Sequence, residues 1–423
     1  MTRFLRTVEY GFAGMTLFVF SGAALLLILS NGANEGDVEV NYDTSLYQLA
    51  FLLIYLITVL LLALRWKKSL YKLTKTNFVL GFILFAIVSI LWSSAPDATL
   101  RASIKLIGSG LFGLYLSTRY SLRQLVLILA WVSGISIVLS FLFVILLPQY
   151  GVMGGVHAGT WRGVYMHKNI LGSRMVISIT VFLLLIFANR EYRWIPWLGI
   201  SLAVILLLLS KSTASLLNGF FCIAFFWILQ TLRWNYRLMV LSLSMITSIA
   251  MLLMIYLGSN LEPIAQLLGK DLTFSGRSTL WAAAWEMIQR RPLLGYGFDG
   301  FWHGMDGESA YVWVVTGWKM THAHNGFIEV WLELGLLGFL IFLLSFAQNL
   351  SRALTLVRLS STSIAFYPVI SLLLLLTSNL AESSLLSSDL ACSIYVFLTI
   401  AIPKELACVK SSKTQTSLLA AHT

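Results

Sequence analysis

The sequence contains little charge. Of its 423 residues, 11% are Asp, Glu, Lys or Arg, 58% are hydrophobic, and the mean hydropathy is +0.84. A water-soluble domain needs more polar residues than this to cover its surface. The scarcity of charge therefore excludes an ordinary soluble protein and predicts a chain that lies mostly in a lipid bilayer.

Cysteine is also scarce. Cys222, Cys392 and Cys408 are the three cysteines, and none lies at a spacing typical of a metal site or a disulfide framework. No soluble domain or low-complexity linker separates the hydrophobic runs. No cleavable signal is evident either, because the first hydrophobic run is long enough to span a membrane and no small-residue cleavage site follows it.

Long apolar runs are what the sequence has instead. A transmembrane helix needs about 20 mostly apolar residues, and we predict about twelve, which makes the fold an all-α integral membrane protein. The predicted spans are 11–30, 46–64, 77–93, 101–117, 124–147, 170–188, 195–210, 214–232, 238–258, 325–345, 363–380 and 386–402. They form one polytopic domain, 1–402, with a large loop at 259–324 between spans 9 and 10 and a disordered tail at 403–423.

The basic residues predict the orientation. If the N-terminus is cytoplasmic, most of the 29 Lys and Arg residues fall on the cytoplasmic side, as the positive-inside rule requires. Both termini are then cytoplasmic, and the large loop is periplasmic. Arg162, Lys168 and Arg277 are among the basic residues that go against this bias. An anionic ligand at the outer face would explain them.

The large loop has a helical pattern. Apolar residues recur at helical spacing from Arg277 to Arg290, which predicts an amphipathic helix at the membrane interface with its tryptophans at headgroup depth. Pro292 ends it. At the N-terminal end of this helix, the charge of Arg277 adds to free backbone N–H groups and suits a phosphate. The alternative is a surface helix that only caps the bundle.

Polar residues gather where the tenth span begins. His322, His324 and Asn325 lead into it, and the carboxyl groups of Glu329 and Glu333 follow at steps of four residues on one helix face. Carboxylates at membrane depth tend to be functional. Zinc would need a third ligand beside the two histidines, and none stands at a known spacing, so we predict no metal.

A second polar cluster precedes the sixth span. Arg162, His167 and Lys168 lie there, where they could bind an anion or serve only as an interfacial anchor. Lys211, in a short turn, is a further candidate cation, although the segment is equally typical of a simple turn. Arg290 is a secondary candidate at the end of the loop helix.

Several fragments together resemble the signature of the O-antigen ligase and polymerase superfamily. They are Gly-Arg at 276–277 with Trp281, PLLGYG at 292–297, HAHN at 322–325 and ELGLLG at 333–338. Two more, LWSSAP at 91–96 and MHKNILG at 166–172, resemble its exopolysaccharide-polymerase branch. The match covers about residues 77–345. The resemblance implies a GT-C-like fold and a metal-independent, inverting glycosyltransferase without a cofactor. Its donor would be a glycan on undecaprenyl diphosphate, used at the periplasmic face of the bacterial inner membrane.

The resemblance also implies roles for individual residues. The arginine and histidine of the family motifs match Arg277 and His324. Arg162 matches an upstream arginine of the family less closely. His322 does not align with the matching position of the motif. We therefore expect His324 to be the general base, with Asn325 orienting it or the acceptor. We expect the diphosphate to be bound by Arg162, His167, Lys168 and Arg277. The secondary candidates are His322, Glu329, Arg290 and Lys211.

The acceptor remains open at this point. A polymerase would extend a carrier-linked repeat unit, and segments 92–93 and 167–169 favour it, whereas a ligase would use lipid A-core or protein. A metal-dependent transferase that uses acidic residues of the loop 31–44 is a further alternative. A transporter of lipid-linked oligosaccharides is disfavoured, because no internal repeat is visible and the polar clusters lie at the membrane surface. We expect no nucleic-acid partner.

Overall fold

A computed structural model of the chain describes residues 3–33, 43–74, 77–188, 193–242, 244–245, 248, 277–385 and 389–421. Within these ranges the chain forms helices and no strand, apart from two isolated bridges, Ala23 with Tyr165 and Val152 with Trp161. The longer helices are α1 (Arg3–Phe20), α3 (Ser45–Ala63), α5 (Asn77–Val88), α6 (Pro96–Arg119), α7 (Leu122–Leu146), α9 (Lys168–Ala188), α10 (Trp194–Leu209), α11 (Thr213–Thr231), α14 (Arg277–Arg290), α16 (Gly326–Leu359), α17 (Tyr367–Ser378) and α18 (Asp389–Ala421). The shorter elements are α2 (Leu25–Leu29), α4 (Trp66–Leu73), α8 (Pro148–Gly151), α15 (Ala310–Thr316), η1 (Ser89–Leu91), η2 (Gly155–His157), η3 (Gly304–Asp306) and η4 (Ser363–Phe366).

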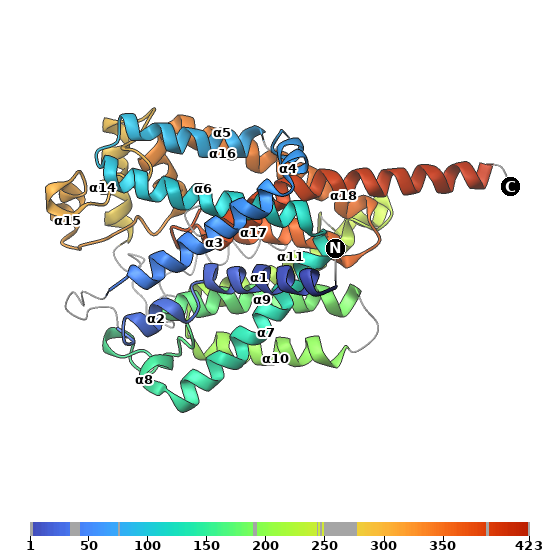
Figure 1. The fold of residues 1–423 in the computed structure, drawn as a ribbon, viewed down its shortest axis with the longest axis horizontal. Helices are drawn as coiled ribbons and strands as arrows, with labels where there is room; N and C mark the ends of the chain where they lie inside the picture. The colour runs from blue at the N-terminus through green and yellow to red at the C-terminus, as the bar shows by residue number, and fades with distance from the viewer. Residues whose placement is uncertain are drawn as a thin grey trace.

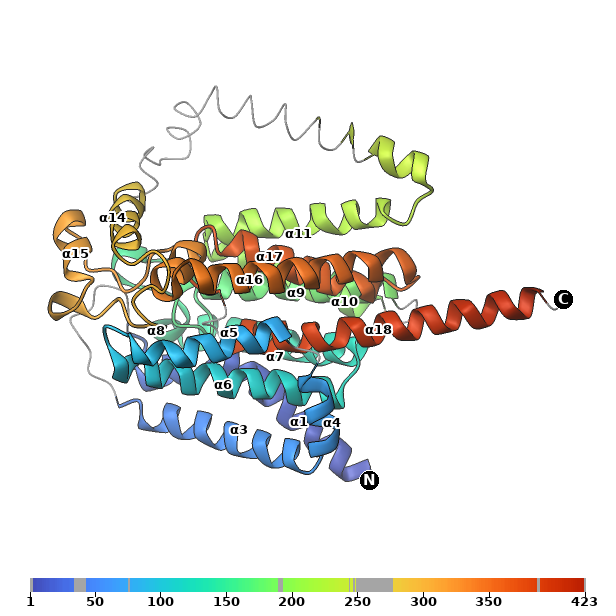
Figure 2. The same ribbon diagram turned by 90° about the horizontal axis from the view of Figure 1, so that it is seen from above.

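The long helices lie side by side in one bundle (Figures 1 and 2). α9 packs against α7, α10 and α11, and α18 packs against α6 and α16. The N-terminus and the end of α18 lie at one end of the bundle, whereas α8, α14 and α15 lie at the other, here called the loop end (Figure 1). This separation puts the motif-bearing loops far from both termini.

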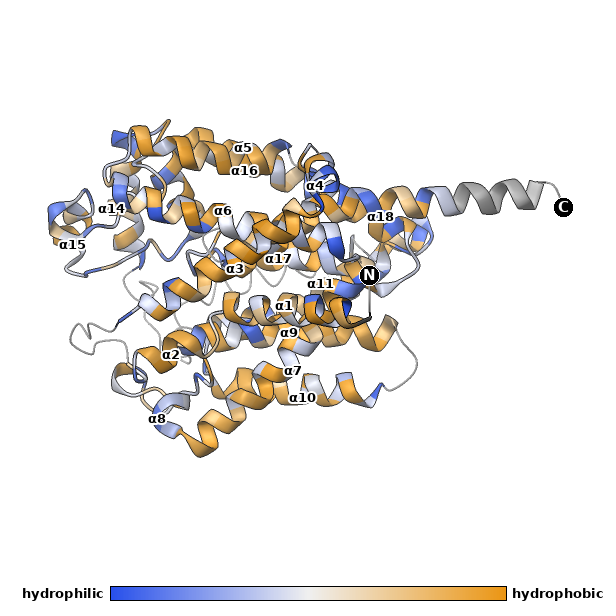
Figure 3. Ribbon diagram, in the orientation of Figure 1, coloured by the Kyte–Doolittle hydropathy of each residue, from blue (hydrophilic) through white to orange (hydrophobic). Residues whose placement is uncertain are grey.

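Length and hydropathy agree with a membrane protein. In the described ranges, six helices are long and apolar enough to cross a membrane, or seven if the bent pair α4–α5 counts as one span. Hydrophobic residues cover the helices along their length, and hydrophilic residues gather toward the two ends (Figure 3). The chain is therefore a multi-pass, all-α membrane protein. Most of the predicted ninth span, 238–258, lies outside the described residues.

The two ends of the chain differ from the sequence-based boundaries. α1 begins at Arg3 and ends at Phe20, because a turn at Gly22 (φ 80°) separates it from α2, where a single span over 11–30 was expected. At the other end, α18 continues through Pro403 to Ala421, over the stretch expected to be disordered. The residues that follow Pro403, Lys-Glu-Leu-Ala, are strong helix formers, so the helix resumes after the one backbone hydrogen bond that proline cannot donate.

α16 is broken at Gly335, where φ is 64° and ψ is −170°. The segment 292–297 docks into this break through its backbone. The amide of Leu336 donates to the Pro292 carbonyl at 2.8 Å, and the amide of Gly297 donates to the Glu333 carbonyl at 2.8 Å. Two of the family-like motifs are therefore hydrogen-bonded to each other, which fixes the loop on α16.

The predicted loop helix is present as α14, and its apolar face packs inside the protein. Leu280, Met287 and Ile288 form a small core with residues of the loop and of α16, such as Phe301 and Leu332. The helix is thus held by its own packing and not only by a lipid surface. Its attachment to α16 carries the N-terminal end of α14 toward the start of that helix.

Candidate functional site

His324 lies directly before α16 in an unusual backbone conformation. Its φ is 51°, in the left-handed region that side chains other than glycine rarely adopt. Its ring stacks on Trp318 with centroids 5.9 Å apart, and the His322 ring lies 4.0 Å away. The Nδ1 atom is buried and has no hydrogen-bond partner. Strain of this kind is often found at functional sites.

The chain around His324 is held by the loop that follows α17. The Asn325 amide donates to the Ser383 hydroxyl at 3.0 Å, and the Gly326 amide donates to the Asn379 carbonyl at 2.9 Å. A side chain at Gly326 would meet the Asn379 side chain at 2.2 Å. Close backbone contact at this point therefore requires glycine. The loop 379–385 thus positions the histidine.

Glu382 connects the histidine to the start of α9. One of its carboxylate oxygens lies 4.0 Å from His324 Nδ1, and the other accepts a hydrogen bond of 3.0 Å from the Asn169 side chain. Residues 322–326, the loop 379–385 and the start of α9 therefore meet at the loop end. Two of the polar clusters that the sequence singles out are brought together.

The imidazole of His324 is neutral in this environment. Burial, followed by the positive charges of His322, Arg277 and His167, lowers the pKa of His324 to about 3. A group that acts on this pKa must lie close enough for its field to reach the ring. Arg277 at the start of α14 and His167 before α9 are therefore electrostatic neighbours of His324.

Hydrogen bonds from α16 and α14 support the chain at Ala323, next to His324. Glu329 in α16 accepts hydrogen bonds from the Ala323 amide at 2.6 Å and from the Trp302 indole at 2.5 Å. The Trp281 indole of α14 donates to the Ala323 carbonyl at 2.9 Å. Glu329, a secondary candidate by sequence, thus holds the backbone of the site. α14 is tied to the same residue.

Arg162 lies in a different setting from the one expected for a diphosphate ligand. Its side chain is fully buried, and its guanidinium donates to four carbonyl groups. Two belong to Gly32 and Ala33, after α2, and two to Gln149 and Tyr150, in α8. This geometry ties the first and third loops together, which is a structural task.

The other predicted residues are divided between the site and its surroundings. Asn325 caps α16 by accepting from the amides of Phe327 and Ile328. His167 Nδ1 accepts from the Asn169 amide at 3.2 Å, and Lys168 begins α9. Arg290 lies over the Tyr311 ring at 4.7 Å, and Lys211 is exposed in the turn between α10 and α11. No contact among the described residues joins these last two to His324.

A third candidate metal ligand is present that spacing along the chain did not reveal. The ligand atoms of His322, His324 and Glu382 lie within 4.8 Å of one another, so these side chains could hold a metal ion. Ligand bonds of about 2.0–2.2 Å place the ligand atoms of a tetrahedral zinc site roughly 3.4 Å apart. His324 Nδ1 and the nearer Glu382 oxygen are 4.0 Å apart, so these two side chains would have to move closer together to bind zinc.

Sequence reasoning missed Glu382, Ser383 and Asn379. They follow α17 in a short stretch rich in serine, with no helical spacing and no motif that would separate them from a solvated loop. Their relation to His324 appears only when α16 and α17 pack together. The polar residues between spans 11 and 12 were the sole signal available.

Comparisons with known proteins relate the sequence to one family. A family model described as O-antigen ligase matches residues 198–343, a range that includes α14, the docked segment 292–297 and His324. The exopolysaccharide production protein ExoQ of Rhizobium meliloti (strain 1021) is 26% identical over 335 residues, which cover 76% of this chain and 73% of that protein. The resemblance drawn from the motifs is confirmed. The chain is similar to the O-antigen ligase and polymerase superfamily over residues 198–343 and to ExoQ over most of its length.

Proposed function

We propose that the protein is a polysaccharide polymerase of the bacterial inner membrane, with its site at the periplasmic face and both termini in the cytoplasm. It transfers a glycan from undecaprenyl diphosphate to a sugar hydroxyl of a carrier-linked repeat unit, with inversion and without a metal. The observation that carries the proposal is the neutral imidazole of His324, which stands on a strained backbone and whose pKa is lowered by burial and by nearby positive charge.

The chemistry assigns each group one task. His324 takes the proton of the acceptor hydroxyl, whose oxygen attacks C1 of the donor sugar as the bond from C1 to the diphosphate breaks. The diphosphate leaves with the bonding electrons. Arg277, Lys168 and His167 stabilise its growing negative charge, so they bind the transition state better than the ground state.

A pKa of about 3 describes His324 without a bound anion. A diphosphate beside Arg277 offsets a positive charge that lowers this pKa. The pKa then rises toward the range in which a histidine is an effective base. Substrate binding and activation of the base are thus coupled through Arg277.

The remaining residues position this machinery. Arg162 holds the first and third loops together, Asn325 fixes the start of α16, and Glu329 supports the backbone at Ala323. Glu382 faces His324 Nδ1 and can stabilise the imidazolium that forms when the ring accepts a proton. The donor site and the base are therefore built from the loops before α9, α14 and α16 together.

A ligase is the second candidate function. The family model that matches residues 198–343 is described as O-antigen ligase, which favours transfer to lipid A-core or protein. Similarity to an exopolysaccharide production protein favours the polymerase. Both enzymes need the same donor site and base, so the residues above serve either one.

The test uses purified full-length protein and defined undecaprenyl-diphosphate repeat units, first alone and then with a lipid A-core acceptor. Polymer from repeat units alone, unchanged by a chelator, is the expected result. Product formed only with lipid A-core would establish the ligase instead. Inhibition by the chelator would contradict the metal-independent mechanism. No product in either reaction would overturn the transferase function.

A further inference from the structure

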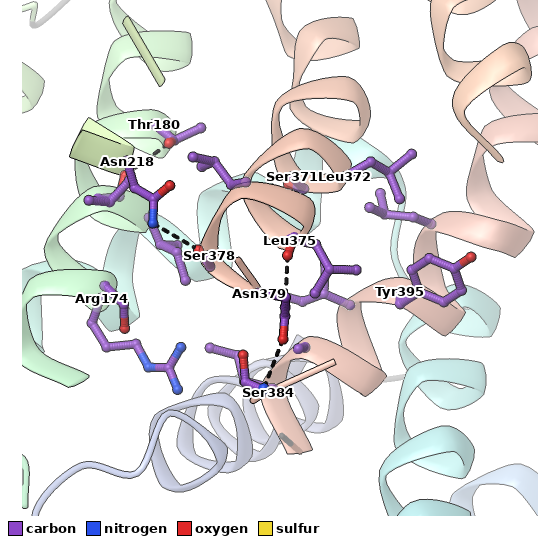
Figure 4. Close-up of a pocket in the computed structure, with 18 of the residues that line it drawn as sticks. Arg174, Thr180, Asn218, Ser371, Leu372, Leu375, Ser378, Asn379, Ser384 and Tyr395 are labelled. Carbon is purple, nitrogen blue, oxygen red and sulfur yellow. Dashed lines mark hydrogen bonds between the residues drawn. The ribbon is translucent and has the colours of Figure 1, made fainter. Parts of the chain in front are cut away.

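A cavity of about 140 Å³ lies between α9, α11, α17 and α18 (Figure 4). Its polar end is formed by Arg174, Asn218, Ser378, Asn379 and Ser384. Mostly apolar side chains line the rest of the cavity, among them Ile177, Leu372, Ile394 and Leu398, together with the polar Thr180, Ser371 and Tyr395. The polar end adjoins the loop 379–385, which also holds the backbone of Asn325 and Gly326, directly after His324. The cavity thus lies beside the proposed active site.

Arg174 brings a positive charge to this cavity. Its Nε donates to the Ser21 carbonyl at 2.9 Å, and its guanidinium points across the cavity toward Ser384 (Figure 4). None of the ion pairs found in the described ranges includes Arg174. By contrast, Lys105 in a neighbouring polar cavity lies 3.4 Å from the Asp389 carboxylate.

A cation on a membrane helix without an acidic partner is costly. The neutral groups around Arg174 largely satisfy one another. The Asn218 side chain donates to the Ser378 hydroxyl at 3.2 Å, and the Ser384 amide donates to the Asn379 side chain at 2.8 Å. The charge of Arg174 is therefore the main feature at this end that a ligand can use. The ligand that complements it is an anion.

Size and polarity define the ligand further. An apolar cavity of about 150 Å³ accepts a group the size of benzene, so the space here suits a five-carbon isoprene unit and is too small for a glycan repeat. The charge stands at one end, and the rest of the lining is mostly apolar. This gradient matches an amphiphilic anion that enters with its chain toward Leu398 and its head at Arg174.

We propose that this cavity binds a lipid phosphate, with the phosphate at Arg174 and the first isoprenoid carbons along α17 and α18. The inference rests on the proposed function, because a carrier held here would present its phosphates next to His324. Arg174 is then a positioning residue for the donor, in addition to Arg277. It does not touch the reacting atoms.

The test measures binding of undecaprenyl phosphate to the purified full chain. We expect Arg174→Gln to weaken binding by about 10- to 100-fold, the value of a lost charged hydrogen bond. Arg174→Lys should retain most of the affinity. Arg358→Gln, the same change on an exposed side chain, is the matched control and should bind as the wild type does. Unchanged affinity in folded Arg174→Gln protein would overturn the proposal.

A second variant tests the apolar part. Ala391→Phe fills the cavity from α18, and should weaken binding of undecaprenyl phosphate while leaving binding of inorganic pyrophosphate unchanged. Equal weakening of both probes, or of neither, would contradict a chain-binding cavity. This variant also keeps the proposal testable if Arg174→Gln fails to fold.

The two proposals fail in different ways. His324→Ala protein should bind undecaprenyl phosphate normally, because the base does not hold the carrier. If binding depends on Arg174 but the wild type transfers no glycan, the proposed function is lost and the lipid site stands. If Arg174→Gln protein binds undecaprenyl phosphate and builds polymer as the wild type does, the lipid site is lost and the function stands.

Discussion

At the residue scale, the site depends on how His324 is held. Its left-handed backbone (φ 51°) is followed at once by the helix cap at Asn325 and by the close contact at Gly326. A strained conformation persists only where its surroundings fix it. Here Ser383 and Asn379 do so from a different part of the chain. The His324 ring is therefore oriented before the substrate binds.

Removal of the base gives the first prediction. His324→Ala should lower the rate of polymer formation by about 10²–10⁴-fold, the usual value of general-base catalysis. His322→Ala, two residues away, is the control and should lose less, because His322 lies outside the proton-transfer step. Rates would be measured with purified protein whose membrane insertion is verified. A wild-type rate in inserted His324→Ala protein would refute the assignment.

The charge of Arg277 gives the second prediction. Because a nearby cation disfavours the protonated ring, Arg277→Gln should raise the pKa of His324 above its value of about 3. Nuclear magnetic resonance of labelled histidine would follow the titration. Arg290→Gln, at the other end of α14, is the control and should leave the pKa of His324 where it is. An unchanged pKa in the Arg277 variant would separate α14 from the site.

At the scale of elements, the break in α16 joins two motifs. A side chain at Gly335 would meet the Leu293 backbone at 2.3 Å, and its φ of 64° suits glycine. This conformation, with ψ at −170°, is essentially restricted to glycine and alone costs an alanine about 1–3 kcal/mol. The clash adds to this cost. The segment 292–297 then cannot stay docked on α16.

Gly335→Ala should therefore lower the melting temperature and open the loop end to protease. Thermal unfolding and limited proteolysis between α14 and α16 would report the two effects. Gly134→Ala in α7 is the matched control, because a side chain there meets nothing within 4 Å. If both variants melt and resist protease as the wild type does, the docking of the loop does not depend on this break.

The link between α14 and the histidine segment can be tested separately. Trp281→Phe removes the hydrogen bond to the Ala323 carbonyl but keeps an aromatic ring. A net hydrogen bond is worth about 0.5–1.5 kcal/mol, so the rate should fall by about 2- to 10-fold. Trp285→Phe, on an exposed side chain of the same helix, should have no such effect. Equal rates in the two variants would show that the bond does not position His324.

At the scale of the whole molecule, the sequence was informative wherever a local pattern carried the information. Hydropathy predicted a helical membrane protein, and the spacing of apolar residues predicted α14 with its bounds. Long-range packing was not visible. The carbonyl partners of Arg162, the place of Glu382 beside His324 and the break at Gly335 each depend on segments distant in the chain. The local spacing of apolar residues does not predict such contacts.

The same scale carries the prediction of topology. The proposed site lies at the loop end of the bundle, and the C-terminal part of α18 lies at the other (Figure 1). Asp306 is exposed at the loop end, and Cys408 is exposed on α18. If the basic residues fix the orientation, the loop end is periplasmic and the end of α18 is cytoplasmic. A maleimide that does not cross membranes should then label the cysteine of Asp306→Cys protein in intact cells. The same reagent should label Cys408 only after the membrane has been permeabilised. The native chain, with Cys222 and Cys392 buried, is the control. The reverse pattern would place the site in the cytoplasm and remove its access to a periplasmic donor. Labelling of both positions in intact cells would contradict the separation of the two ends by a membrane.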